Sequence, residues 1–138
     1  MANRTFTIIK PDSVRKGNFD KIISRLETEG FTILGLKKTG LSQRQAEGFY
    51  AVHRERPFFP DLVKYMTSGP VYVAALQREN AVAHLRQVMG ATDPKKADKN
   101  TIRSEFGESI EQNAIHGSDS DENARIEIGF FFAESELM

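Results

Sequence analysis

The segment from Ile126 to Phe132 constrains the fold of this chain more than any other part of its sequence. Apolar side chains recur there at every second position: Ile126, Ile128, Phe130 and Phe132, separated by Glu127, Gly129 and Phe131. This two-residue period predicts a β-strand with one face toward the core. A parallel sheet covered by helices would instead give unbroken apolar runs, so the segment favours an antiparallel sheet.

Local patterns upstream predict three more strands and several helices. The predicted strands are Arg4–Lys10, Phe31–Thr39 and Val71–Leu76, and the predicted helices are Phe19–Leu26, Ser42–Tyr50, Leu62–Met66 and Asn80–Met89. Ser42 and Gln45 form a capping-box pattern that opens the second helix. This order of elements predicts an α+β fold of the ferredoxin-like, split βαβ class, with a four-stranded antiparallel sheet and helices packed on one face.

The stretch between Gly90 and Asn100 is polar and has no apolar period. After it, Ile102, Phe106 and Ile110 predict one or two short amphipathic turns. A long loop of this kind in a compact domain is usually functional or disordered. Because it leads toward His116, we interpret it as functional.

Length and composition set further limits. The chain has 138 residues, 39% of them hydrophobic, which predicts a single domain over residues 1–138 with an ordinary core. Its 19 basic and 19 acidic residues cancel, so bulk charge recruits neither nucleic acid nor an anionic membrane. There is no cysteine and no long apolar run near the N-terminus. We therefore expect no disulfide, signal peptide or membrane span, and a cytoplasmic protein.

Residues 113–119 read Asn-Ala-Ile-His-Gly-Ser-Asp and set His116 beside a glycine, a hydroxyl and a carboxylate. A neutral imidazole can carry a phosphoryl group when a carboxylate on its other nitrogen stabilises the cation. Gly117 would let the backbone or phosphate of another molecule come close. Glu127, the one acid within the predicted last strand, is a better orienter than adjacent Asp119. On these residues alone, a surface-loop histidine with a solvent-facing Glu127 remains the open alternative.

The other two histidines carry less information. His84 falls on the polar side of its predicted helix, and His53 lies among charged residues. We expect no carboxylate or glycine arrangement around either, so neither is a candidate nucleophile.

The common phosphate-binding loops are absent from the sequence. It contains no G-x-x-x-x-G-K-[ST], no G-x-G-x-x-G after a strand and no protein-kinase signature. If the protein handles triphosphates, side chains must replace these loops. Lys10, Arg86 and Arg103 are candidates because their charged groups bind phosphate oxygens, although a residue of this kind taken by itself is more often a surface cation.

The segment Arg56-Pro57-Phe58-Phe59-Pro60 holds two aromatic rings between prolines. A ring presented in this way stacks on a flat ligand such as a base without reading its edges. Core packing is the alternative, above all for Phe59. No His or Cys cluster has metal-ligand spacing, so we expect any metal to be a hard cation such as Mg²⁺, carried on phosphates.

Several segments together resemble the nucleoside diphosphate kinase family. Residues 113–119 are similar to the N-x-x-H-G-S-D signature of that family. Further segments match in the same order along the chain: Thr7–Asp12, Arg56–Phe59, Tyr65–Pro70, Gly90–Pro94 and Thr101–Arg103. Independent motifs in register are far more specific than any one of them, and they favour His116 as the nucleophile.

The resemblance implies a ping-pong phosphotransferase that maintains NTP and dNTP pools. A nucleoside triphosphate, mainly ATP, would phosphorylate His116, and a nucleoside diphosphate would then take the phosphoryl group, with Mg²⁺ bridging phosphates. Matching positions imply phosphate contacts from Lys10, Arg86, Thr92 and Arg103, and ribose contacts from Lys10 and Asn113. They also imply that Phe58 stacks on the base, that Tyr50 packs beside the histidine, and that Ser118 supports Glu127, which bonds to the imidazole.

Two departures from the family pattern bear on assembly. The loop after Thr92 usually carries Pro-Gly just before Thr-Ile-Arg, whereas this chain has Lys99-Asn100 there. Because that loop takes part in subunit contacts in many members, we expect the change to affect assembly. The chain also ends at Met138, without the longer tail of hexameric eukaryotic members. The resemblance therefore implies the shorter bacterial type, a homo-oligomer built from dimers, with a tetramer favoured over a hexamer.

Two other classes of function are alternatives. A relative devoted to binding or regulation would share the fold, but intact Lys10, Arg103, Asn113 and His116 argue against lost catalysis. A small-ligand regulatory domain of ferredoxin-like fold would not need the histidine and predicts no phosphoenzyme. A turnover assay with several nucleoside diphosphates separates these classes.

Overall fold

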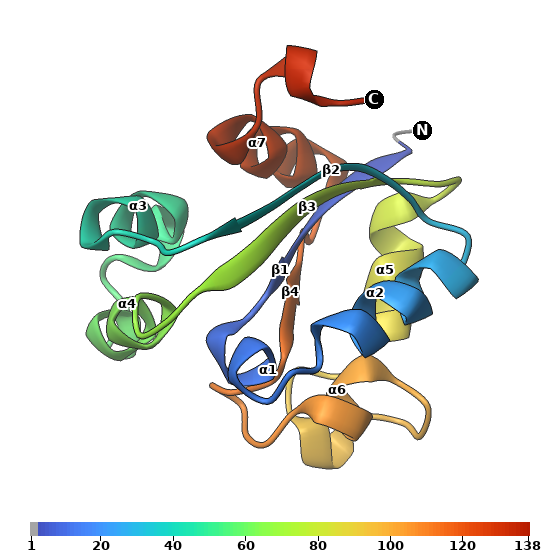
Figure 1. The fold of residues 1–138 in the computed structure, drawn as a ribbon. Coiled ribbons are helices and arrows are strands. Elements are labelled where there is room, and N and C mark those ends of the chain that lie inside the picture. Colours follow the sequence, from blue (N-terminus) through green and yellow to red (C-terminus); the bar gives the residue numbers. More distant parts are fainter. Residues whose placement is uncertain (1–2) are drawn as a thin grey trace.

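A four-stranded antiparallel sheet in the order β2-β3-β1-β4 forms the centre of the molecule (Figure 1). The computed structural model describes residues 3–138. Its strands are β1 (Arg4–Ile9), β2 (Thr32–Thr39), β3 (Val71–Gln77) and β4 (Ile115–Gly117). The first three strands and the α+β class with an antiparallel sheet are confirmed, but the fourth strand lies elsewhere in the sequence than predicted.

Helices and short turns connect the strands. Among the described residues the α-helices are α1 (Pro11–Arg15), α2 (Phe19–Thr28), α3 (Gln43–Phe49), α4 (Phe59–Met66), α5 (Ala81–Met89), α6 (Ile102–Phe106) and α7 (Asp121–Phe131). The predicted capping box opens α3: Ser42 Oγ accepts from the Gln45 backbone N–H at 3.1 Å, and Gln45 Oε1 accepts from the Ser42 N–H at 2.8 Å. Within residues 3–138, no helix combines the length and apolar character needed to cross a membrane.

The segment predicted to be the last strand is helix α7 instead, so that prediction was wrong. Ala124 and Ile128 are buried along α7, four residues apart, whereas Ile126 is 59% exposed and Phe130 is 42% exposed. Burial therefore follows the helical period and not the two-residue period. The apolar residues alternate in the sequence because Ile126 and Phe130, which a strand would bury, lie on the exposed surface of the helix.

The signals that start α7 lie upstream of the alternating segment. Ser120 caps the helix by accepting a hydrogen bond from the Asn123 backbone N–H at 3.0 Å. Asp121 and Glu122 occupy the first turn, where negative charge favours the positive end of the helix dipole. These signals start the helix upstream of the alternating segment.

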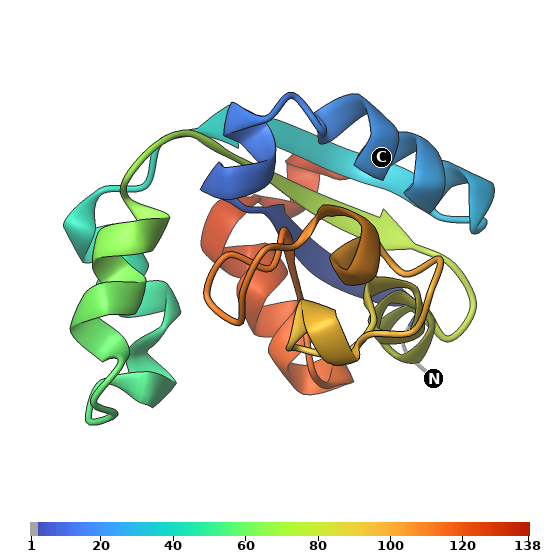
Figure 2. The ribbon, with the colours of Figure 1, turned by 90° about the horizontal axis from the view of Figure 1, so that it is seen from below.

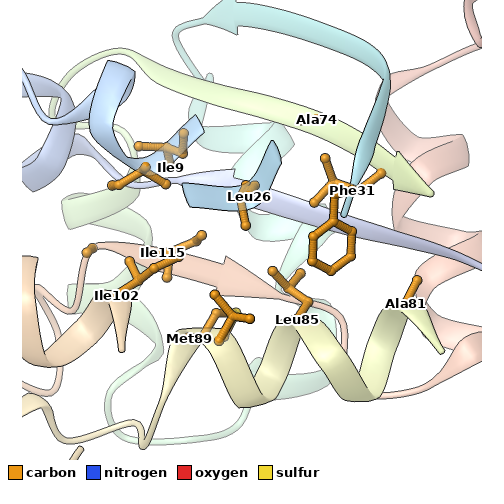
Figure 3. Close-up of a cluster of buried hydrophobic side chains, with 13 residues drawn as sticks. Ile9, Leu26, Phe31, Ala74, Ala81, Leu85, Met89, Ile102 and Ile115 are labelled. Carbon is orange, nitrogen blue, oxygen red and sulfur yellow. The ribbon is translucent and has the colours of Figure 1, made fainter. Parts of the chain in front are cut away.

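Helices α2 and α5 cover one face of the sheet. Ile9 and Ile115 from the sheet pack there with Leu26 from α2 and with Leu85 and Met89 from α5 (Figure 3). This cluster is the first of two cores.

Helix α7 covers the opposite face, with α3 and α4 packed at one end of the sheet (Figure 1). Phe6 and Ile8 from β1 are fully buried there beside Ile128 of α7 and Tyr65 of α4. The sheet thus has helices on both faces and not on one face as predicted, because the segment predicted to be the last strand forms a helix that covers the sheet. The α3–α4 pair stands to one side of the remaining helices in both views (Figure 2).

Strand β4 pairs with β1, placing Ile8 opposite His116. Because side chains alternate along a strand, His116 lies on the α7 face and Ile115 and Gly117 lie on the α5 face. A Cβ at Gly117 would meet Met89 Sδ at 2.5 Å. The space that the sequence interpretation assigned to a second molecule is therefore filled by α5 of the same chain.

Candidate active site

His116 in β4 contacts a carboxylate that α7 supplies. Its Nε2 is 3.0 Å from Glu127 Oε1, and Ser118 Oγ donates a hydrogen bond to the same oxygen at 2.7 Å. The His116 and Glu127 side chains are 21% and 19% exposed, and Ser118 is fully buried. Because Nε2 faces the carboxylate, Nδ1 is the ring nitrogen left to attack a ligand.

Aromatic rings from β1 and from the end of α3 pack against the imidazole. The ring centroids of Phe49, Tyr50 and Phe6 lie 5.4, 6.2 and 6.3 Å from that of His116, with the rings edge to face. Burial, and to a smaller extent the Glu127 carboxylate, raises the pKa of the Tyr50 phenol, which therefore stays protonated. These rings shield one side of the imidazole from water.

Lys10, at the end of β1, is joined to the polar segment before β4. Its Nζ donates to Asn113 Oδ1 at 2.7 Å, and Asn113 Nδ2 donates to the Thr92 carbonyl at 3.0 Å. Burial is the main cause that lowers the pKa of Lys10 to about 8, and the nearby Arg103 charge adds to it, while Asp12 acts in the opposite direction. A buried ammonium of this kind favours an anionic ligand.

Arg103 of α6 is held against the backbone of the same region. Its Nη2 donates to the Ile115 carbonyl at 2.8 Å and its Nη1 to the Gly90 carbonyl at 3.3 Å. Burial first, and the charge of Arg86 second, lower the pKa of Arg103 to about 10. The Arg103 charge therefore acts on Lys10 and the Arg86 charge acts on Arg103. Cationic side chains of this kind bind phosphate oxygens.

The remaining predicted ligand contacts lie at the surface. Arg86 is exposed and lines a hollow of about 530 Å³ together with Asp119. Thr92 is exposed as well. Phe58, which precedes α4, is 46% exposed, and its ring centroid lies 5.4 Å from that of His53.

Three predictions about individual side chains need comment. Phe59 packs against the second core, in line with the alternative interpretation of that ring. Asp119 accepts a hydrogen bond from Asn123 Nδ2 at 2.6 Å, which engages one of its carboxylate oxygens away from His116. The expectation that His84 lacks a carboxylate was wrong, because its Nε2 is 2.9 Å from Glu29 Oε1.

The sequence interpretation missed Asp12, Tyr65 and Ala114. Asp12 Oδ2 accepts the backbone N–H of Ala114 at 3.1 Å, and Tyr65 donates its hydroxyl to the other oxygen of Asp12. Asp12 and Tyr65 both lie in segments that matched the family motifs, but no role was assigned to them. Nothing in the residue type of Ala114 indicates its backbone conformation, which has a positive φ of 76°.

A family model described as nucleoside diphosphate kinase matches residues 3–137. The chain belongs to the nucleoside diphosphate kinase family. One curated nucleoside diphosphate kinase, from a Nitratiruptor species, is 61% identical and aligns over 98% of each chain. Another, from an Anaeromyxobacter species, is 58% identical over 97% of this chain and 91% of its own length.

Solved nucleoside diphosphate kinase structures have the same fold. The enzyme from Aquifex aeolicus superimposes with a TM-score of 0.96 at 45% identity, covering 99% of both chains. The enzyme from Halobacterium salinarum, solved in complex with CDP, gives a TM-score of 0.95 at 39% identity over 100% of this chain and 92% of that chain.

The departure from the nucleoside diphosphate kinase pattern at Lys99-Asn100 can be described in backbone terms. Asn100 has a φ of 68°, in the left-handed region. Glycine adopts this region most readily, and asparagine is among the side-chain-bearing residues that adopt it best. Asn100 therefore takes a conformation that the usual glycine would also allow.

Proposed function

We propose that this protein is a cytoplasmic nucleoside diphosphate kinase. It transfers the terminal phosphoryl group of a nucleoside triphosphate, mainly ATP, to a nucleoside diphosphate through a phosphohistidine on His116, and so maintains NTP and dNTP pools. The observation that carries the proposal is the chain of contacts from Ser118 to Glu127 to His116, in a site whose buried cations are Lys10 and Arg103.

The first half-reaction exchanges one P–O bond for one N–P bond, and the second half-reaction reverses the exchange. His116 Nδ1 attacks the γ-phosphorus, the bond to the β–γ bridging oxygen breaks, and the electron pair leaves with the diphosphate. Glu127 accepts the Nε2–H of the resulting cation and stabilises its charge. In the second half, an oxygen of the acceptor diphosphate attacks the same phosphorus, and the N–P bond breaks to return neutral His116.

Side chains bind the nucleotide in place of a glycine-rich loop. Lys10, Arg86, Thr92 and Arg103 contact phosphate oxygens, and Lys10 and Asn113 reach the ribose. The two buried cations are already desolvated, so they interact strongly with charge that develops on the transferring phosphoryl group.

The remaining contacts set orientation. Phe58 stacks on the base, and stacking without edge contacts accepts any base. Tyr50 packs beside His116, and Ser118 keeps Glu127 in place.

A divalent cation such as Mg²⁺ belongs to the proposal as part of the substrate complex. Within residues 3–138, no group of three or more His, Asp or Glu side chains could hold a metal ion. The oxygens of the nucleotide phosphates are donors of the kind that Mg²⁺ prefers. When bound there, the ion neutralises phosphate charge.

The test is incorporation and release of phosphate. With γ-labelled Mg-ATP the protein should acquire one acid-labile phosphate, and added GDP should remove it as GTP. His116→Ala should incorporate none, whereas His84→Ala, which removes a histidine with its own glutamate, should behave as wild type. A His116→Ala protein that still accepts and passes on the phosphate would refute the assignment. Turnover without any phosphoenzyme would refute the ping-pong route.

We also propose that the subunits form a homo-oligomer built from dimers, with a tetramer favoured over a hexamer. Measurement of the solution mass decides between the two. The double variant Lys99→Pro/Asn100→Gly restores the usual family residues in the loop. We expect it to differ in mass from wild type, and an identical mass would show that the loop change has no effect on assembly.

A further inference from the structure

The chain makes a strained turn immediately before the strand that carries His116. Ala114 has a φ of 76°, and the Ile115 backbone N–H donates to the Asn113 carbonyl at 2.9 Å. A hydrogen bond between residues two apart, around a central residue with φ near +75°, defines a γ-turn of the rare, strained kind. Ala114 carries a Cβ, so the surrounding structure must hold it in this conformation.

The turn lies between two groups of the site. Asn113, on one side, bonds to Lys10 and to the Thr92 carbonyl, and His116, on the other, bonds to Glu127. Any change of backbone angle at Ala114 would rotate one group relative to the other. The turn therefore sets the position of the nucleophile relative to the residues proposed to bind the ribose and phosphates.

Backbone and side-chain groups from residues 10–12 hold both polar atoms of Ala114. Its carbonyl accepts the Lys10 backbone N–H at 2.9 Å, and its own N–H donates to Asp12 Oδ2 at 3.1 Å. Ala114 is fully buried and Asp12 is 1% exposed, so water cannot replace either bond.

Tyr65 of α4 fixes Asp12 in turn. Its hydroxyl donates to Asp12 Oδ1, and it accepts the Asp12 backbone N–H at 3.0 Å. Burial and the bond to Asp12 raise the pKa of the Tyr65 phenol, so the donated proton is retained. Each oxygen of the Asp12 carboxylate thus has its own donor, one from α4 and one from the turn.

Asp12 has no comparable task within its own helix. It lies in the first turn of α1, but the side chain bonds outward, to the Tyr65 hydroxyl and the Ala114 N–H. The first turn of α1 is closed by backbone bonds from Ser13 and Val14 to the Lys10 carbonyl. The carboxylate is therefore directed at the turn before β4.

We propose that Asp12 and Tyr65 are positioning residues, which hold Ala114 in its strained conformation and thereby align His116 with the nucleotide. The proposal rests on the proposed function, since its effect is on phosphoryl transfer to His116.

The test is a double-mutant cycle between the clamp, Asp12 with Tyr65, and the turn. Asp12→Ala should lower the single-turnover rate constant for phosphorylation of His116 at saturating Mg-ATP by about 10- to 100-fold, because small misplacements of a reacting group have effects of that size. In a protein that also carries Ala114→Gly, the same Asp12→Ala change should cost less than about 5-fold. Glycine takes positive φ without a Cβ penalty and needs no clamp.

The rate constant separates alignment from folding, because it refers only to molecules that react, whereas the amplitude reports the active fraction. Tyr65→Phe keeps the ring, removes one donor, and should give a smaller loss that Ala114→Gly also reduces. If Asp12→Ala and Tyr65→Phe lower only the amplitude, or if Ala114→Gly leaves their effects unchanged, the positioning role is wrong. A wild-type protein that forms no phosphohistidine would instead overturn the proposed function.

Discussion

Residues 3–138 contain two histidine–glutamate pairs of nearly equal geometry, and only one of them lies in the candidate active site. His116 Nε2 is 3.0 Å from Glu127 Oε1, and His84 Nε2 is 2.9 Å from Glu29 Oε1. The side chains of both pairs are about equally exposed, at 21% and 19% against 25% and 27%. Distance and burial therefore do not distinguish a nucleophile from a structural histidine.

The second hydrogen-bond donor to each carboxylate distinguishes the two histidine–glutamate pairs. Glu127 accepts from the neutral hydroxyl of Ser118, so this second partner adds no positive charge beside the carboxylate. Glu29 accepts from the cationic Arg25 at 3.0 Å, so its charge is divided between two donors. The hydrogen bond from His84 and then that from Arg25 lower the pKa of Glu29. A carboxylate already balanced by a guanidinium is a poor stabiliser of a phosphorylated imidazole.

The largest expected effect comes from neutralising each acid in turn. Glu127→Gln should lower kcat/KM for nucleoside diphosphate phosphorylation by about 100-fold, within the range usual for loss of an acid–base partner. Glu29→Gln should leave it within about 2-fold, because His84 takes no part in transfer. Steady-state kinetics with ATP and GDP measure both values. Equal losses in the two variants would show that the second partner is not what separates the pairs.

The next effect concerns the buried cation that accompanies only the His116 pair. Lys10 has a pKa of about 8 in the fold, against 10.5 for an ordinary lysine. Phosphate contact, as proposed for Lys10, would favour its charged form, so we expect nucleotide binding above pH 8 to take up a proton. The dissociation constant for Mg-ADP should therefore rise about 10-fold between pH 7 and pH 9.

Calorimetry at pH 9 in two buffers of different ionisation enthalpy measures this uptake directly. Lys10→Arg stays charged and should remove the proton uptake, whereas His84→Gln should keep it. Binding at pH 9 with no proton exchanged would contradict the assignment.

In the nucleotide-free protein, the effect of Lys10 on the free energy of unfolding has the opposite sign to that of a salt bridge. The penalty of burying charged Lys10 is fully present below pH 8 and is relieved as the pH rises toward 10.5.

The smallest effect is on stability and belongs to the His84 pair. The lowered pKa of Glu29 means that its contribution is present above the ordinary value of 4.5 and is lost as the pH falls through the folded value. Since the side chain is 27% exposed, Glu29→Gln should lower the free energy of unfolding at pH 7 by only about 0.5 kcal/mol.

Urea unfolding at pH 7 and pH 3 tests this, with exposed Glu27→Gln as the matched control, which should change nothing. A loss that persists undiminished at pH 3 would point to packing and not to the charge of Glu29.

The sequence predicted the elements that have clear local patterns of apolar residues. β1, β2 and β3 and helices α2 and α5 were predicted from such patterns, with ends that differ by a few residues. The segment of α7 misled because its exposed Ile126 and Phe130 created an alternation that the core does not use. A pattern of residue types cannot show which apolar side chains remain on the surface.

The site was predictable only in part, for a related reason. Charge and hydroxyl chemistry singled out His116, Lys10 and Arg103, but their convergence depends on the strand order, which brings residues 10 and 116 to neighbouring strands. The glutamate beside His84 went unnoticed because it lies 55 residues away in the chain. The turn at Ala114 went unnoticed because alanine gives no indication of a positive φ.

The short length of β4 has a consequence for how activity should be interpreted. With three residues, its alignment on β1 depends on few hydrogen bonds and on the contact of Gly117 with Met89. A slip by one residue would turn the imidazole toward α5 and away from Glu127. Such a molecule would be folded yet inert, so the fraction of chains that accept phosphate measures how faithfully one edge strand has paired.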